Sequence, residues 1–225
     1  MSGFISIRRR SFSSRRWLDR QHNDQYRREA IALGYRSRAA IKLLQLDKKL
    51  KLLPNARRAI DLGAAPGSWS QVLARADVRV FAVDVLPMAP IEHVHVIQGS
   101  WPECRPELQR ALGGELVDLV LSDLSPNRSG VDSLDHARLH DLLVPAFELA
   151  RETLRPGGVV VVKTLEGEDH RSWMAALRTF ATVTAHKPAA RRRESRETYI
   201  ILKDLDVVKF DRRGRDAVRK VGYVE

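Results

Sequence analysis

Short apolar runs alternate with longer amphipathic segments along most of the chain. Five of the runs have the composition of buried β-strands, because Val, Leu and Ile dominate them and a glycine or a polar residue ends most of them. These runs are RRAIDLG at 57–63, VRVFAVDV at 78–85, HVHVIQG at 93–99, LVDLVLSD at 116–123 and GGVVVVK at 157–163. Helical patterns lie between them at 71–76 and 139–154, and RPGG at 155–158 is expected to end the second helix. The alternation predicts an α/β fold with parallel strands and crossover helices on both faces.

The end of the chain departs from this alternation. FATVTAHKP at 180–188 and SRETYIILKD at 195–204 have the pattern of two strands joined by a basic turn. We therefore expect an antiparallel strand near the C-terminus to close the sheet. A single domain is predicted over 19–205, between a basic leader at 1–18 and a basic tail at 206–225.

The charge of the chain points to a polyanionic partner. Lys and Arg total 39 against 28 Asp and Glu, which gives a formal charge of +11 and a pI near 10.3. Basicity alone does not distinguish RNA, DNA and anionic lipid. No apolar run approaches the ~18 residues that span a bilayer, so we expect no membrane partner. The single cysteine, Cys104, excludes an internal disulfide and a cysteine-based zinc site.

The leader has the composition of a mitochondrial transit peptide. Arginines and serines fill it, and no acidic residue precedes Asp19. The alternative is a solvated basic arm that contacts nucleic acid, because SSRRWL at 13–18 can also belong to the mature domain. The leader predicts a mitochondrial location, with a bacterial-type cytoplasm as the alternative.

Polar residues end several of the predicted strands. In an open parallel sheet the ligand site lies beyond the carboxyl ends of the strands, so these residues should line one rim. They are Asp61 with Gly63, Asp84, Ser100, Asp123 and Lys163.

The glycine turn after the first strand suggests a nucleoside ligand without a pyrophosphate. Gly63 and Gly67 are spaced G-x-x-x-G, which is neither a dinucleotide fingerprint nor a Walker A loop. Their missing Cβ atoms would let the chain turn sharply with a ligand against the backbone. Asp84 follows about 20 residues later, where an acidic residue accepts hydrogen bonds from ribose hydroxyls. S-adenosylmethionine satisfies both features, and a purely structural turn is the alternative. Trp69 is a candidate cofactor contact, although core packing is the commoner role of such a residue.

Seven motifs carry a resemblance to a known family. In order, they are SSRRWLDRQHNDQY, GYRSRAAIKL, DLGAAPGSWSQ, VDVLPMAPI, LSDLSPNRSG, RPGGVVVVKTLEGE and SRETYIIL. Over roughly residues 14–203 the chain resembles the FtsJ/RrmJ family of S-adenosylmethionine-dependent 2′-O-ribose methyltransferases, which act on large-subunit ribosomal RNA. The resemblance implies a Rossmann-like, class I methyltransferase fold with a mostly parallel seven-stranded sheet.

The resemblance also implies a catalytic tetrad and a cofactor site. The tetrad residues are Lys42, Asp123, Lys163 and Glu197. The implied cofactor contacts are Gly63, Gly67, Trp69, Asp84, Ser100 and Asp123. Bacterial relatives carry an Asp at the position of Ser100, near the adenine, so this substitution bears on cofactor affinity.

Methyl transfer to a ribose hydroxyl requires alignment of the reacting atoms and removal of one proton. We expect Lys163 to accept that proton, because partial burial and a second ammonium group, from Lys42, would disfavour its charged form. Asp123 would orient Lys163 close to the cofactor methyl group. Lys42 and Glu197 would position the ribose. The alternative is a surface lysine beside a turn-forming aspartate.

Arginines near the tetrad are candidates for RNA contact, although a run of arginines is usually a solvated loop. They are Arg36, Arg38, Arg191, Arg192, Arg193 and Arg196. No metal is expected, since His136 and His140 have the spacing of helix ligands but no third ligand is apparent.

The predicted function is 2′-O-methylation of large-subunit rRNA, at a uridine of the A-loop, with a role in maturation of that subunit. The predicted partners are this rRNA or its assembly intermediate, with ribosomal proteins or assembly factors as further candidates. A non-catalytic RNA-binding assembly factor with the same fold is the alternative. A methyltransferase of tRNA or mRNA caps is a weaker one.

Overall fold

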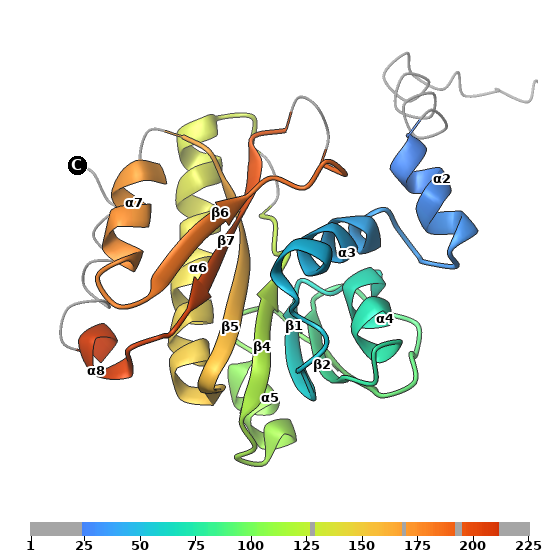
Figure 1. Ribbon diagram of the computed structural model, residues 1–225, viewed down its shortest axis with the longest axis horizontal. Helices are drawn as coiled ribbons and strands as arrows, with labels where there is room; N and C mark the ends of the chain where they lie inside the picture. The colour runs from blue at the N-terminus through green and yellow to red at the C-terminus, as the bar shows by residue number, and fades with distance from the viewer. Residues whose placement is uncertain (1–23, 127–128, 168–169, 192–194, 212–225) are drawn as a thin grey trace, which may run out of the picture.

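The computed structural model describes residues 24–126, 129–167, 170–191 and 195–211 (Figure 1). The predicted leader and residues 212–225 of the predicted tail lie outside these ranges. In the part of the chain that is described, no helix combines the length and the apolar character needed to cross a membrane.

The described residues form one seven-stranded sheet in the order β3-β2-β1-β4-β5-β7-β6. The strands are β1 (Arg58–Leu62), β2 (Arg79–Asp84), β3 (Val94–Gln98), β4 (Val117–Ser122), β5 (Leu154–Leu165), β6 (Thr182–His186) and β7 (Glu197–Lys203). The strands from β1 to β5 pair in parallel, and β7 runs antiparallel to both of its neighbours, β5 and β6. The predicted mixed sheet is confirmed.

Helices pack on both faces of the sheet, as predicted (Figure 1). On one face lie α3 (Ala39–Leu50) and α4 (Ser68–Ala74), and on the other lie α5 (Arg105–Leu112), α6 (Asp132–Thr153) and α7 (His170–Leu177). The short helices α2 (Gln25–Ala32) and α8 (Val207–Lys209) flank them. Along β5, Val160 and Val162 join the core beneath α6, whereas Val161 joins the core beneath α3. Burial on both faces explains why this strand is a continuous apolar run rather than an alternating one.

RPGG at 155–158 follows the end of a helix, as predicted, but it belongs to β5. Helix α6 ends at Thr153, and Leu154 is already extended and pairs with Val117. The next pair is Val159 with Leu119, so the four residues of RPGG bulge opposite Asp118 alone. Arg155, within this bulge, forms an ion pair with Asp118. The turn residues therefore mark an irregularity in a strand, which a local pattern does not distinguish from a helix stop.

The antiparallel direction of β7 brings the start of that strand to the rim where the parallel strands end. Glu197 pairs with Leu165, and Tyr199 pairs with Lys163. The carboxyl end of β5 and the amino end of β7 therefore lie side by side.

We predict that Leu121→Ala lowers the free energy of unfolding by about 2–5 kcal/mol, because it opens a cavity in a central strand. Leu121 is 0% exposed in β4, between β1 and β5. Leu116→Ala is the matched control, since Leu116 is 46% exposed. Urea unfolding measures both variants, and equal losses would contradict the predicted packing.

Candidate active site

Four charged side chains from distant segments meet at this rim. They are Lys42 of α3, Asp123 after β4, Lys163 near the end of β5 and Glu197 at the start of β7. Lys42 and Glu197 form a buried ion pair. Lys163 Nζ lies 3.2 Å from Asp123 Oδ1 and donates to the carbonyl oxygen of Asp123 at 2.6 Å. The structure therefore brings the whole predicted tetrad together, with two positive and two negative charges.

Tyr199 joins the two ion pairs. Its hydroxyl lies 2.8 Å from Asp123 Oδ1 and 2.6 Å from Glu197 Oε1, and it accepts a hydrogen bond from Lys42 Nζ at 3.3 Å. A phenol has one hydrogen, so it can donate to only one carboxylate at a time. The sequence analysis did not single out Tyr199. The available signal was its position two residues after Glu197, since alternate residues of a strand share a face.

Two groups of the cluster, Asp123 and Tyr199, have shifted pKa values. Burial alone would raise the pKa of Asp123, but the ammonium groups of Lys163 and Lys42 and the Tyr199 hydroxyl outweigh it, so the pKa is lowered. Burial and the carboxylates of Asp123 and Glu197 raise the pKa of Tyr199 well above its ordinary value. Asp123 is therefore an anion and Tyr199 a neutral hydrogen-bond donor at neutral pH.

The glycine turn has a reason that differs from the predicted one. Gly63 has a φ of +76°, and a Cβ there would lie 2.8 Å from the backbone nitrogen of Leu124. At Gly67, with a φ of +104°, a Cβ would lie 2.6 Å from an Arg36 nitrogen and 2.8 Å from Met88 Sδ. Protein atoms fill both spaces. The glycines thus permit the turn and close packing of the chain on itself, rather than leaving open space for a ligand at those two points.

Three carboxylates gather around this turn. Asp61 is 0% exposed, and burial is the main cause that raises its pKa to about 7, opposed by a hydrogen bond from Ser70. The charges of Asp123 and Asp84 raise the pKa of Asp61 further. Among the described residues Asp61 Oδ1 has no hydrogen-bond partner. Asp61 is fully enclosed by protein and about half protonated at neutral pH, so Asp84 and Asp123 are the carboxylates of this group that would face a positively charged ligand. S-adenosylmethionine carries a sulfonium and an ammonium group.

Asp84 ends β2 beside the glycine turn. Its carboxylate accepts hydrogen bonds from the backbone of Ala65 at 2.9 Å and of Leu86 at 2.8 Å, which fixes it beside the turn. Val85 and Leu86 follow it with 63% and 61% exposure. An anchored carboxylate next to exposed apolar side chains suits a ribose joined to a base.

Ser100 lies at the end of β3, in the rim, as predicted. Its hydroxyl donates to Glu103 Oε2 at 2.8 Å, and this bond lowers the pKa of Glu103. An ionised carboxylate is therefore present beside Ser100, although the residue itself brings no charge.

Trp69 lies inside the core. It is 2% exposed, its indole N–H donates to the Ala39 carbonyl at 2.8 Å, and its ring centre lies 5.6 Å from that of Tyr199. It therefore supports the α3 and β7 sides of the cluster. Its role as a cofactor contact stays a prediction that this packing does not favour.

The candidate RNA-binding arginines are largely engaged within the protein. Arg36 donates to the carbonyl oxygens of Pro66, Ala89 and Pro90 at 2.7–3.1 Å, so it ties the glycine turn to the loop after β2. Arg38 forms an ion pair with Asp24 at 2.5 Å.

The other arginines of this group precede β7. Arg191 donates to the Ser195 carbonyl at 2.9 Å, and Arg196 is exposed. Arg192 and Arg193 lie outside the described residues. RNA contact by these arginines, and by Arg36 and Arg38, remains a prediction.

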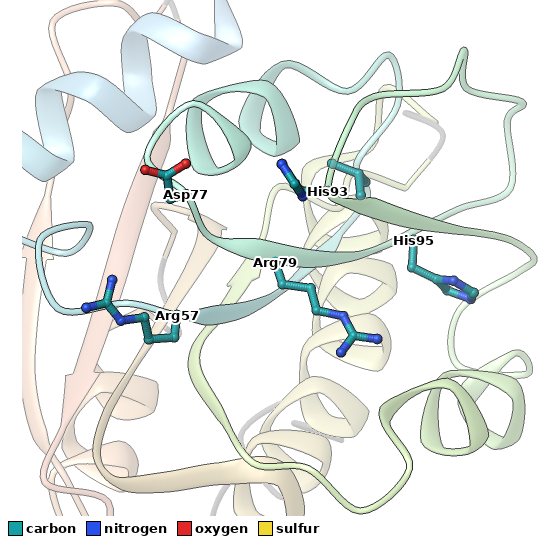
Figure 2. Close-up of a pocket in the computed structure, with 6 residues that line it drawn as sticks. Arg57, Asp77, Arg79, His93 and His95 are labelled. Carbon is teal, nitrogen blue, oxygen red and sulfur yellow. The ribbon is translucent and has the colours of Figure 1, made fainter.

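A pocket of about 420 Å³ lies at the opposite end of the strands (Figure 2). It is lined by Arg57, Asp77, Arg79, His93, Val94 and His95, which lie at or just before the amino ends of β1, β2 and β3. It is therefore separate from the rim that holds the tetrad.

Within the described ranges, no group of three or more His, Cys, Asp and Glu side chains is arranged to hold a metal ion. His136 packs against Gly167, and His140 lies with its ring centre 5.6 Å from that of Trp173.

Comparisons with known proteins match nearly the whole chain. A family model described as FtsJ-like methyltransferase matches residues 35–205. Ribosomal RNA large subunit methyltransferase E of Zymomonas mobilis is 48% identical over 205 residues, which cover 89% of this chain and 92% of that protein. The protein of the same name from Azoarcus sp. is 43% identical over 203 residues, covering 88% and 99%. The crystal structure of a ribosomal RNA methyltransferase from Plasmodium falciparum gives a TM-score of 0.68 at 28% identity, over 76% of this chain and 99% of that one.

We predict a pH dependence of stability that belongs to Asp61. Its pKa rises from 3.8 to about 7 on folding, so the folded protein binds the extra proton between these values. The extra stability that Asp61 gives to the folded protein through this bound proton is complete below pH 3.8. It is lost as the pH rises to about 7. Relative to the wild type, Asp61→Asn should therefore gain stability with rising pH, by up to about 1.4 kcal/mol per pH unit.

Urea unfolding of both proteins between about pH 4.5 and 8 measures this effect. Asp77→Asn is the control, because Asp77 is an exposed carboxylate at the other end of the strands. Parallel stability curves for Asp61→Asn and the wild type would show that Asp61 is not the group responsible.

Proposed function

Because the chain belongs to the FtsJ-like methyltransferase family, whose cofactor is S-adenosylmethionine, we propose that it methylates a ribose 2′-hydroxyl of large-subunit ribosomal RNA. The observation that carries the proposal is the buried, charge-balanced cluster of Lys42, Asp123, Lys163 and Glu197 around Tyr199. It adjoins a negatively charged rim that fits the cofactor.

The cofactor would be held by Asp84, which accepts hydrogen bonds from the ribose hydroxyls, and by the negative charge of Asp123. When bound, S-adenosylmethionine supplies an electrophilic methyl group on a sulfonium that is a good leaving group. The protein's main tasks are then alignment of the acceptor oxygen and removal of its proton.

Lys163 is the proposed proton acceptor. The Lys163 ammonium group first releases a proton to solvent; the RNA 2′-oxygen then forms a bond to the methyl carbon while the carbon–sulfur bond breaks, and the hydroxyl proton passes to the Lys163 amine. Asp123 orients this amine through both its carbonyl and its carboxylate oxygen. The side chain of Lys163 is only 10% exposed, which limits competition from water for the proton.

Lys42, Glu197 and Tyr199 hold the other side of the acceptor site. Lys42 donates to both Glu197 and Tyr199, so its ammonium group has a fixed direction. Tyr199 links this pair to Asp123. A polar network satisfied in this way is rigid, which suits the alignment of a hydroxyl for in-line attack.

The finer features of the proposal rest on the motif resemblance. They are the A-loop uridine as target, the role in maturation of the large subunit, and contacts with ribosomal proteins or assembly factors. A mitochondrial location rests on residues 1–18, which lie outside the described residues. The relatives from Zymomonas mobilis and Azoarcus sp. are bacterial proteins, which fits the bacterial-type alternative.

We predict that Lys163→Met lowers methyl transfer at least about 100-fold, because a positioned general base contributes about 10²–10⁴-fold. Cofactor binding, measured by calorimetry, should change less than about threefold. Lys187→Met is the matched control, since Lys187 is 45% exposed and pairs with Glu166.

The assay uses labelled S-adenosylmethionine and unmodified large-subunit rRNA of Zymomonas mobilis, with that organism's 48% identical enzyme as positive control. Nucleoside mass spectrometry of digested RNA distinguishes a 2′-O-methyl group from base methylation. Cofactor binding without methyl transfer by the wild type would overturn the proposal and favour the assembly-factor alternative. Binding lost in Asp84→Ala would support the assigned ribose contact.

We predict that Tyr199→Phe lowers kcat about tenfold while the KM for the cofactor stays within about twofold. The change removes only the hydroxyl that links the two ion pairs, and it takes away the one hydrogen bond that the phenol donates to either Asp123 or Glu197. Tyr35→Phe, at a tyrosine that stacks on Arg75, is the control. An unchanged kcat would remove Tyr199 from the positioning network.

A further inference from the structure

The edge strand β6 is covered by helices on one face only. On the covered face, Val183, Ile200 and Leu202 join the core that includes α6 and α7. On the opposite face α3 covers Tyr199 and Ile201 of β7. Thr182 and Thr184 of β6 remain exposed there, and among the elements that are described none lies in front of β6 in the view of Figure 1.

Three basic side chains belong to this open face. Residues paired across strands share a face, so the pairing of His186 with Tyr199 and of Lys203 with Thr182 assigns both to the Tyr199 side. Lys49 lies seven residues after Lys42, on the same stripe of α3 and about 10 Å farther along its axis. Burial and the ammonium groups of Lys49 and Lys203 lower the pKa of His186, so both charges lie near that imidazole.

The charge of this face is not neutralised within the described chain. Neither Lys49 nor Lys203 forms an ion pair with a described residue, whereas other cations such as Arg38, Arg58 and Lys187 do. Of the acidic residues nearest in sequence, Asp47 accepts a hydrogen bond from the Leu53 backbone, and Asp204 is exposed beyond the end of β7.

From this arrangement we propose that the open face of β6, with Thr182, Thr184 and His186 and the flanking Lys49 and Lys203, binds the phosphate backbone of the RNA next to the reacting ribose. The proposal deepens the proposed function and rests on it. The surface begins at His186, beside Tyr199 of the tetrad cluster, and ends at Lys203. The two positions are four residues apart along β6, or about 13 Å.

Charge complementarity and position favour RNA over other partners. Ammonium groups and threonine hydroxyls are typical phosphate contacts, which position a nucleic acid without reading its sequence. The exposed large apolar residues of the described chain lie elsewhere, for example Val85, Leu116 and Val207. The face therefore lacks the apolar anchors of a protein or lipid interface. It also continues directly from the cluster at which the ribose must lie.

The test compares two double variants of the full chain. Lys49→Gln/Lys203→Gln removes two charges from the proposed surface. Arg110→Gln/Arg178→Gln removes two charges from exposed positions at α5 and α7, which pack on the other face of the sheet. Binding to unmodified large-subunit rRNA of Zymomonas mobilis is measured between about 50 and 200 mM KCl, with unfolding curves to verify folding.

The first variant should weaken RNA binding about tenfold and reduce the slope of log K against log salt by about 1.4–1.8, because each phosphate contact contributes about 0.7–0.9. The control variant should bind RNA within about twofold of the wild-type affinity, and its slope of log K against log salt should equal that of the wild type. Cofactor affinity and kcat at saturating RNA should stay within about twofold in both variants, since neither lysine belongs to the cluster.

Equal binding and equal slopes for the two variants would overturn the proposal even if the wild type methylates RNA. Loss of binding to assembled large subunits, with binding to naked rRNA unchanged, would assign the face to a ribosomal protein and also overturn it. A wild type that binds RNA but transfers no methyl group would refute the proposed function alone, because the binding comparison does not depend on catalysis.

Discussion

The structure depends on one buried group of charges, in which two ammonium groups and two carboxylates are balanced around a single phenol. Removing such charges from water is costly, and the cost is offset only when the charges are paired and their remaining hydrogen-bonding capacity is used. Lys42 with Glu197 and Lys163 with Asp123 provide the pairing, and Tyr199 connects the two pairs. Every element that contributes a residue to this group must therefore be held in register with the others. The order and direction of the central strands are those that bring these charged residues to the same end of the sheet.

The antiparallel pairing of β7 with β5 meets that requirement. A parallel β7 would carry Glu197 and Tyr199 to the other end of the sheet, far from Lys163. In the observed pairing Tyr199 lies directly opposite Lys163. Trp69 then packs against Tyr199 from α4 and donates to Ala39 at the start of α3, so the core beneath the cluster supports the residues that act in it.

The cofactor side of the rim differs, because Asp61 and Asp84 form no ion pair with a described residue. Burial is the main cause that raises the pKa of Asp61, and the charges of Asp123 and Asp84 raise it further. A site of this kind is stabilised when a positively charged ligand enters it. Arg36 does not neutralise these carboxylates, since its guanidinium is used by three backbone carbonyls that hold the turn and the loop after β2.

The sequence by itself determined the alternation of strands and helices, the antiparallel strand near the C-terminus and the four residues that meet at the rim. Runs such as GGVVVVK are determined by burial on both faces, so local patterns were sufficient for the strands, whereas the four rim residues followed from the resemblance of the ordered motifs to a known family. Only the tertiary structure decided that RPGG is a bulge in β5, that the spaces beside Gly63 and Gly67 are filled by Leu124 and Arg36, and that Tyr199 links the ion pairs. Those features depend on contacts between residues far apart in the chain. Periodicity and composition describe only neighbours along the chain, and therefore carry no information about which distant atoms will touch.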